Sequence, residues 1–181
     1  MSPAPVIVEA CELPALSELR VLDPDFVRSA YFQDAYRTRL ECSNASPVAI
    51  FQSVFAHHPT WMKVVLIARN RLASLAGLDA PTASEIMKPE MKSHYAVGEK
   101  IGPWPIFSLS ESELIAGRDN THLDFRLSVL RETDGETASV VVSTVCRVHK
   151  TFGKVYLFFI VPFHRWGVRR LIKTAVMAGR L

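Results

Sequence analysis

The spacing of hydrophobic positions along this 181-residue chain changes twice. Helical spacing over 47–78 gives way to alternating apolar and polar residues from about Ile106 to Val161, and the last segment returns to helical spacing. This order predicts an α+β fold with a helical hairpin after the first strand. We expect a curved antiparallel sheet wrapped around one long C-terminal helix.

The first strand is expected over 34–42, where alternation puts Tyr36 and Leu40 on the buried side. Residues 1–30 carry four prolines and are interpreted as an irregular N-terminal arm. A single domain is therefore expected over 31–181.

Residues that favour the beginning of a helix precede both helices of the expected hairpin. Ser46 is an expected N-cap before Pro47, a residue favoured at the first helical position, so a helix should run over 47–56. A second helix is expected after Pro59, with Trp61 on its apolar stripe.

Turns placed at Asp119-Asn120, Asp134-Gly135 and Phe152-Gly153 would align the later strands on one continuous apolar face. The side chains expected on that face are Leu114, Ala116, Leu123, Phe125, Leu127, Val129, Val140, Val142, Thr144, Cys146, Leu157, Phe159 and Val161. The closing helix, expected over 163–180, has its own apolar stripe, which would lie against this face and which contains Val168, Leu171, Ile172, Ala175, Val176 and Gly179.

On the opposite face the same register predicts a polar cluster of Glu113, His122, Asp124, Arg126, Arg147 and Tyr156. Glu113 would lie opposite Arg126, and His122 opposite Arg147. Two interpretations remain open. The cluster is either an exposed lattice of cross-strand ion pairs, or an anion site built by Arg126 and Arg147 with His122 as acid or base.

The net charge of +3 is concentrated in one segment. The closing helix region contains no acidic residue and five of the 21 cations, namely Arg165, Arg169, Arg170, Lys173 and Arg180. The remainder has 16 cations against 18 anions, a balance of −2, so no nucleic-acid partner is expected. The basic helix face is either simply solvated or makes a weak contact with a membrane or an acidic partner.

Other sites are not indicated. The three cysteines form no CxxC pair, which argues against a disulfide framework and a thiolate metal site, so we expect a reducing, cytoplasmic setting. No metal ligand set, phosphate-binding loop or nucleophile elbow is present, and no cofactor is expected. The N-terminus lacks the pattern of a signal peptide.

Several local strings together resemble an uncharacterised bacterial domain family. They are Asp34-Ala-Tyr-Arg37, Pro59-Thr-Trp61, Arg69-Asn-Arg71, Gly77-Leu78, His122-Leu-Asp-Phe-Arg126, Val148-His149, Gly153-Lys-Val-Tyr156 and Pro162-Phe-His-Arg165. The resemblance covers about residues 30 to 175. It implies a helix-grip fold similar to the START, polyketide cyclase (SRPBCC) and pollen-allergen superfamily, and relatives that occur alone or fused behind an epimerase-like or dehydrogenase-like domain. It implies no catalytic residues.

Three functions follow as hypotheses. The first is a binding module that encloses a small apolar or amphipathic molecule between sheet and helix. Its cavity would be lined by Trp61, Leu123, Phe125, Leu127, Val142, Thr144, Leu157, Phe159, Leu171 and Ala175. The second is an enzyme of the cyclase, hydratase or isomerase kind, acting through His122, Asp124, Arg126 or Tyr156. The third is a non-catalytic domain that docks through the basic helix onto an oxidoreductase or a membrane.

Overall fold

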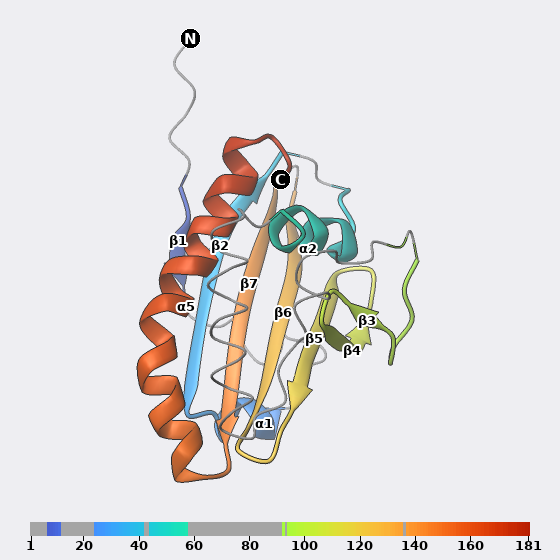
Figure 1. Ribbon diagram of the computed structural model, residues 1–181. Helices are drawn as coiled ribbons and strands as arrows, with labels where there is room; N and C mark the ends of the chain where they lie inside the picture. Colours follow the sequence, from blue (N-terminus) through green and yellow to red (C-terminus); the bar gives the residue numbers. More distant parts are fainter. Residues whose placement is uncertain (1–6, 12–23, 42–43, 58–91, 93, 136) are drawn as a thin grey trace.

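A single seven-stranded antiparallel sheet organises the protein (Figure 1). The computed structural model describes residues 7–11, 24–41, 44–57, 92, 94–135 and 137–181. The strands are β1 (Glu9–Cys11), β2 (Phe32–Leu40), β3 (Lys100–Ile101), β4 (Trp104–Leu109), β5 (Glu113–Asp119), β6 (Leu123–Asp134) and β7 (Thr137–Val148), in the spatial order β1-β2-β7-β6-β5-β4-β3. The helices within the described residues are α1 (Pro24–Arg28), α2 (Pro47–Phe55) and α5 (Thr151–Met177).

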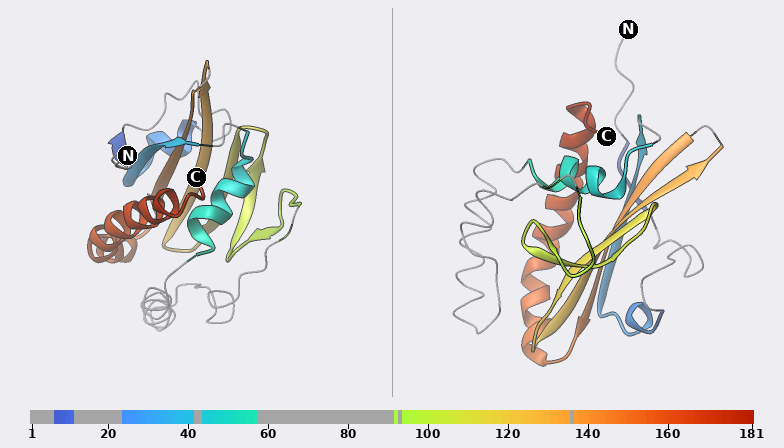
Figure 2. Two further views of the ribbon diagram at one scale, coloured as in Figure 1. Left: turned by 90° about the horizontal axis from the view of Figure 1, so that it is seen from above. Right: turned by 90° about the vertical axis from the view of Figure 1, so that its right-hand side faces the viewer.

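The two faces of the curved sheet carry different helices (Figure 2). We call the face covered by α2 and α5 the inner face, and the face that α1 packs against the outer face. The α+β class and the long C-terminal helix on a curved antiparallel sheet are therefore confirmed.

The main core lies between the inner face and the two helices. Ile50 and Val54 of α2 and Ile172 and Ala175 of α5 are almost fully buried there, and the last residue, Leu181, packs into the same cluster. Most of the hydrophobic stabilisation comes from this layer, because burying one such side chain contributes about 1.5–3 kcal/mol. A smaller cluster on the outer face is centred on Phe26 of α1.

β2 and α2 match the strand and the helix that the sequence predicts over 34–42 and 47–56. β2 buries Tyr36 and Leu40, as the alternation predicts. The Ser46 side chain accepts a hydrogen bond from the Ala49 amide at 3.2 Å, and Pro47 begins α2. The expected second helix and Trp61 lie outside the described residues.

The faces of β5, β6 and β7 are as predicted, but their pairing is offset. Glu113 pairs with Leu130, four residues further along β6 than the predicted partner Arg126. Arg147 pairs with Asp124 rather than His122, an offset of two residues. The loops explain both offsets: residues 120–122 connect β5 to β6, and the left-handed Gly135 belongs to a turn after Asp134. Because side chains alternate with a period of two, even offsets leave each residue on its predicted face.

The prediction of a strand over 155–161 is wrong. These residues belong to α5, which starts at Thr151 and continues past Pro162. Leu157 remains buried, but Phe159 is 63% exposed, and Phe159 therefore lines no inner wall. Tyr156, expected on the polar face of the sheet, also lies on α5.

A helix forms here because the sheet has no free position beside β7. Both edges of β7 are paired, one with β2 and the other with β6. A short apolar run fits a strand or a buried helix equally well, and a proline ordinarily marks a helix boundary, so the local pattern favoured the wrong element. Gly153 is required by close approach rather than by a turn, since a Cβ there would lie 2.6 Å from the His122 carbonyl oxygen.

The N-terminal 30 residues, expected to be irregular, contain two regular elements in their described part. β1 pairs with β2 at the sheet edge, and α1 buries Phe26 on the outer face.

A pair of substitutions on α5 tests its helical conformation. Leu157→Ala should lower the free energy of unfolding by about 2–5 kcal/mol, because it leaves a cavity in a buried cluster. Phe159→Ala should change it by less than about 0.5 kcal/mol, because that ring is exposed. Urea denaturation of both variants gives the comparison. Similar large losses in both would support a strand, in which residues two apart share a face.

Candidate functional site

The inner face carries one group of polar side chains where α5 crosses β2 and β7. Asp34 and Tyr36 lie on β2, and Thr144 of β7 is the direct cross-strand partner of Asp34. His164 approaches from α5, where its Nε2 lies 3.4 Å from Asp34 Oδ1. The Tyr36 hydroxyl donates to Asp34 Oδ2 over 3.1 Å. We call these four residues the inner-face site.

The side chains of the inner-face site are largely withdrawn from solvent. The Asp34 side chain is only 9% exposed, and Thr144 is 6% exposed. Asp34 is satisfied by Tyr36 and His164, but Thr144 Oγ1 has no hydrogen-bond partner among the described residues. A buried hydroxyl without a partner costs free energy, so its presence in a mainly apolar wall calls for an explanation.

Burial and the adjacent carboxylate of Asp34 keep the Tyr36 phenol neutral. Burial, then the neighbouring Asp34 charge and the hydrogen bond to it, raise the pKa of Tyr36 to about 12. The phenol therefore remains a hydrogen-bond donor at neutral pH. The guanidinium of Arg169 lies 5.9 Å from the centre of the Tyr36 ring, and that of Arg165 lies 5.5 Å from the Phe32 ring.

An apolar wall continues from the inner-face site along the sheet. Leu127 and Val142 are buried in the main core, while Leu123 packs with Cys146 and Leu157 in a neighbouring cluster. Trp104 makes edge-to-face contacts with Phe125, Phe51 and Phe55, at ring-centre distances of 5.8, 6.0 and 6.2 Å.

Most of the residues predicted to line a cavity occur on this wall or on the helix above it. Leu123, Leu127, Val142, Thr144, Leu157, Leu171 and Ala175 are buried, and Phe125 is partly buried. Phe159 points outward and is excluded, and Trp61 is outside the described residues.

Sequence reasoning did not single out the inner-face site. The closing helix expected over 163–180 would have His164 at its start, yet His164 lies in the middle of α5. A signal was available, since Asp34-Ala-Tyr-Arg37 and Pro162-Phe-His-Arg165 both belong to the strings that resemble one family. The fold brings these two strings together.

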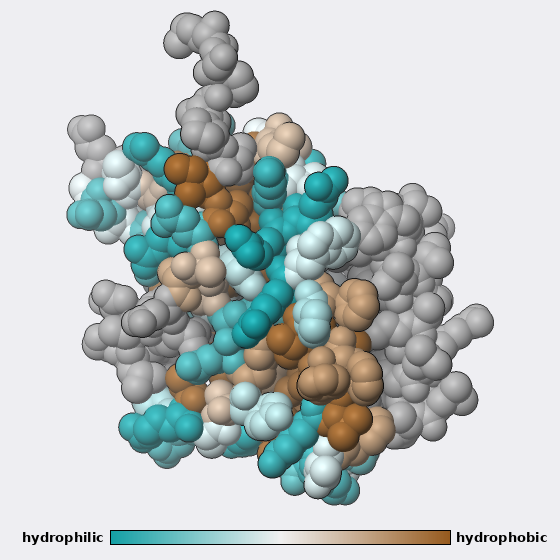
Figure 3. Space-filling view, turned by 90° about the vertical axis from the view of Figure 1, so that its left-hand side faces the viewer, coloured by the Kyte–Doolittle hydropathy of each residue, from teal (hydrophilic) through white to brown (hydrophobic). Residues whose placement is uncertain are grey.

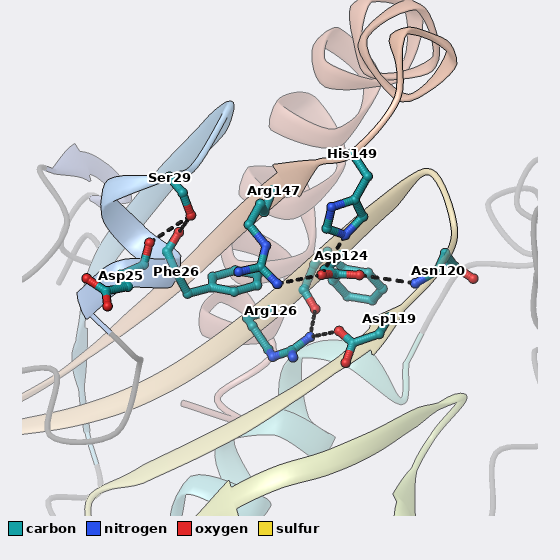
Figure 4. A network of polar contacts seen from close by, with 10 residues as sticks. Asp25, Phe26, Ser29, Asp119, Asn120, Asp124, Arg126, Arg147 and His149 are labelled. Atoms are coloured by element: carbon teal, nitrogen blue, oxygen red, sulfur yellow. Dashed lines mark hydrogen bonds and ion pairs between the residues drawn. The ribbon is translucent and has the colours of Figure 1, made fainter.

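Three members of the predicted polar cluster, Asp124, Arg126 and Arg147, belong to a second network, on the outer face (Figure 4). Asp124 Oδ2 accepts from Arg147 Nη2 at 2.9 Å and lies 2.8 Å from His149 Nε2. Asp124 Oδ1 accepts from the Asn120 amide at 3.2 Å. Arg126 instead donates to Asp119, over 2.6 Å.

Phe26 of α1 lies over the middle of this network. The guanidinium carbons of Arg126 and Arg147 lie 4.9 and 4.8 Å from its ring centre. The guanidinium carbon of Arg126 also lies 3.5 Å from the ring centre of Phe107. Asp124 is itself only 5% exposed, and the expectation of a fully exposed ion-pair lattice is wrong for this residue.

Three members of the predicted cluster are separate from the Asp124 network. Glu113 is buried and accepts a 2.6 Å hydrogen bond from the Ser128 hydroxyl, and burial raises its pKa. His122 contacts Phe152 of α5, with 5.1 Å between ring centres. Tyr156 packs with the cluster around Leu123. The structure therefore does not assemble the six residues into one site.

Neither network is a metal site by composition. Within the described residues, no group of three or more His, Cys, Asp or Glu side chains is arranged to hold a metal ion. The described helices also include none that is long and apolar enough to cross a membrane.

Replacing Thr144 by Val tests whether its hydroxyl is unpartnered. Thr144→Val should raise the free energy of unfolding by about 1 kcal/mol, since an unsatisfied buried group is removed. Thr38→Val is the matched control on β2, where the hydroxyl donates to the Ile7 carbonyl over 3.1 Å, and it should cost about 0.5–1.5 kcal/mol. Equal losses in both variants, measured by urea denaturation, would show that Thr144 has a partner.

The Asp124 network should make stability depend on pH. Burial opposes ionisation of Asp124, but hydrogen bonds from Arg147 and His149 outweigh it and lower the pKa of the carboxyl below its ordinary value. Since the Asp124 carboxyl has a pKa of about 3.9 in the unfolded chain, this stabilisation is present above that pH and is lost as the pH falls through the folded value.

Asp124→Asn should lower the free energy of unfolding by about 1–3 kcal/mol at pH 7, and the difference from wild type should shrink toward pH 3. Asp134→Asn, an exposed change on the same strand, should keep the wild-type pH profile; a difference for Asp124→Asn that is constant with pH would contradict this account.

Comparison with known proteins gives one match. The family model DUF2867, described as a protein of unknown function, matches residues 26–171, a range that includes both polar networks. No curated protein and no solved structure matches the chain. Because the match extends over most of the sequence, the chain belongs to the DUF2867 family of proteins of unknown function.

Proposed function

We propose that the protein binds a small amphipathic molecule between the inner face of the sheet and α5. The ligand's polar end would lie at the inner-face site of Asp34, Tyr36, Thr144 and His164. The observation that carries the proposal is the buried Thr144 hydroxyl, which lacks a partner among the described residues. A ligand hydrogen bond would satisfy it.

The surroundings support a ligand with a sizeable apolar body. Beyond the four polar residues the inner face is formed mainly by aliphatic and aromatic side chains, and Phe125 is only partly buried beside Trp104. Binding sites for small molecules commonly combine such apolar walls with a few convergent polar groups.

The hydrogen-bonding groups of the inner-face site limit which polar groups the ligand can carry. The ionised carboxylate of Asp34 accepts hydrogen bonds but cannot donate them, whereas the Thr144 hydroxyl can do either. A ligand hydroxyl or amide would fit both groups. Arg165 and Arg169, which lie over Phe32 and Tyr36, disfavour a cationic ligand.

The resemblance to the helix-grip superfamily supports the same location. A curved sheet with a long C-terminal helix is the arrangement in which START and polyketide-cyclase proteins are expected to enclose apolar molecules. We extend that architecture to this chain as part of the proposal.

An enzyme acting at the same site is the second candidate. The contact between Asp34 and His164 is of the kind that orients an imidazole for proton transfer, and Tyr36 is a neutral donor nearby. Cyclase, hydratase and isomerase reactions all need such a group. The earlier candidates Asp124 and Arg126 support catalysis less well, because each is engaged in ion pairs on the outer face.

Native mass spectrometry of the purified full chain tests the binding proposal. A co-purified small molecule should add mass to the wild-type protein, and Asp34→Asn and Thr144→Val should lower its occupancy several-fold. Thr38→Val should retain it. The fluorescent probe 8-anilinonaphthalene-1-sulfonate provides a second measurement, and Phe158→Ser on the outward side of α5 controls for surface binding.

A bare polypeptide mass together with no probe binding by wild type would contradict the proposal. Equal occupancy in all variants would place the ligand elsewhere.

A further inference from the structure

We infer that the outward face of α5 docks on an anionic phospholipid membrane. This inference concerns a different surface from the inner-face site and does not depend on the proposed ligand. It starts from an unusual concentration of exposed apolar side chains on one helix.

From Val155 to Trp166, α5 presents large apolar side chains to solvent. They are between 50% and 75% exposed, and they are Val155, Phe158, Phe159, Phe163 and Trp166. We call this set the apolar end. Figure 3 shows brown side chains gathered along part of this side of the molecule, beside a band of teal ones.

Helical spacing explains why these residues share one side. They recur three or four residues apart, on the side of α5 opposite the buried Leu157, Val168 and Ile172. The helix is thus apolar on two sides, and only one of them meets the sheet. Scattered exposed hydrophobic residues are normal, but a contiguous set of this size marks an interaction surface.

The C-terminal half of the same face is cationic. Arg165, Trp166, Arg169, Arg170 and Lys173 line a hollow of about 320 Å³. The sequence has no Asp or Glu after Glu136, so no acidic side chain of α5 neutralises these cations. A hollow with four cations and one aromatic ring suits the phosphate of a lipid headgroup.

An anionic bilayer matches the two halves together. Its acyl region can receive the phenylalanines of the apolar end, and its phosphates lie a few ångströms away, where the arginines and lysine are placed. The helix would lie on the surface, since within the described residues no helix is long and apolar enough to span a bilayer.

A second copy of the chain fits this face less well. Two α5 helices packed with their apolar ends together would bring cations of both copies close to one another or onto apolar rings. Like charges in contact disfavour such a dimer, whereas anionic lipid neutralises them.

Vesicle co-sedimentation of the full-length protein tests the inference. Wild type should bind phosphatidylcholine vesicles that contain phosphatidylglycerol about tenfold or more tightly than vesicles of phosphatidylcholine alone, and added salt should weaken the binding. Two double variants should each lose about tenfold or more: Phe158→Ser with Phe163→Ser, and Arg170→Glu with Lys173→Glu. Arg39→Glu, a charge reversal at an exposed site on β2, should bind like wild type.

Fluorescence reports where the contact occurs. Vesicle binding should shift tryptophan emission to shorter wavelength, and Trp166→Phe should remove most of that shift. Because all the substituted side chains are exposed, the thermal midpoints should stay near wild type, which separates lost binding from lost folding.

Three results would overturn the inference. Wild type could fail to bind anionic vesicles, or both double variants could bind as tightly as Arg39→Glu. Light scattering could instead show a dimer that Phe158→Ser with Phe163→Ser dissociates while no vesicle binding occurs, which would assign the apolar end to a second copy.

Discussion

The packing of α5 against the inner face is the constraint on which the other features depend. Its inward stripe buries Leu157, Val168, Ile172 and Ala175, so the rotation of the helix about its axis is fixed along its length. A helix of 27 residues is about 40 Å long and spans the sheet. The same rotation brings His164 to Asp34 and turns Phe158 away from the sheet.

The two faces of the sheet use polar groups differently. On the outer face, Asp124 is satisfied by three donors and one of them, Arg147, packs on the ring of Phe26, which is the behaviour of a structural network. On the inner face, Thr144 is buried next to Asp34 and its hydroxyl has no partner among the described residues. Buried side-chain atoms without a partner among the described residues also occur on the outer face, for example Ser143 Oγ and Arg147 Nε. Thr144 differs because it lies beside the carboxylate of Asp34 and the apolar wall, and this combination is the reason for assigning ligand binding to the inner face.

The sequence correctly predicted those strands and helices whose local residue pattern matches the burial that each element has in the fold. β2 has clean alternation and α2 has a Ser-Pro start, and both occur as expected. The strand faces were predicted correctly, but the pairing of Glu113 was not, because loop length rather than side-chain pattern sets the register. The extent of α5 and the contact of His164 with Asp34 could not be read locally, since they depend on both edges of β7 being occupied and on residues 130 positions apart.

Spin-label scanning of α5 tests this account most directly. With the native cysteines replaced, a nitroxide would be placed at each position in turn from Lys154 to Ala175, and its mobility measured by electron paramagnetic resonance. The account predicts a mobility period of about 3.6 residues throughout, with minima at Leu157, Val168 and Ile172 and high mobility at Phe158, Phe159 and Phe163. A period of two residues over 155–161, or immobile labels at the three phenylalanines, would contradict it.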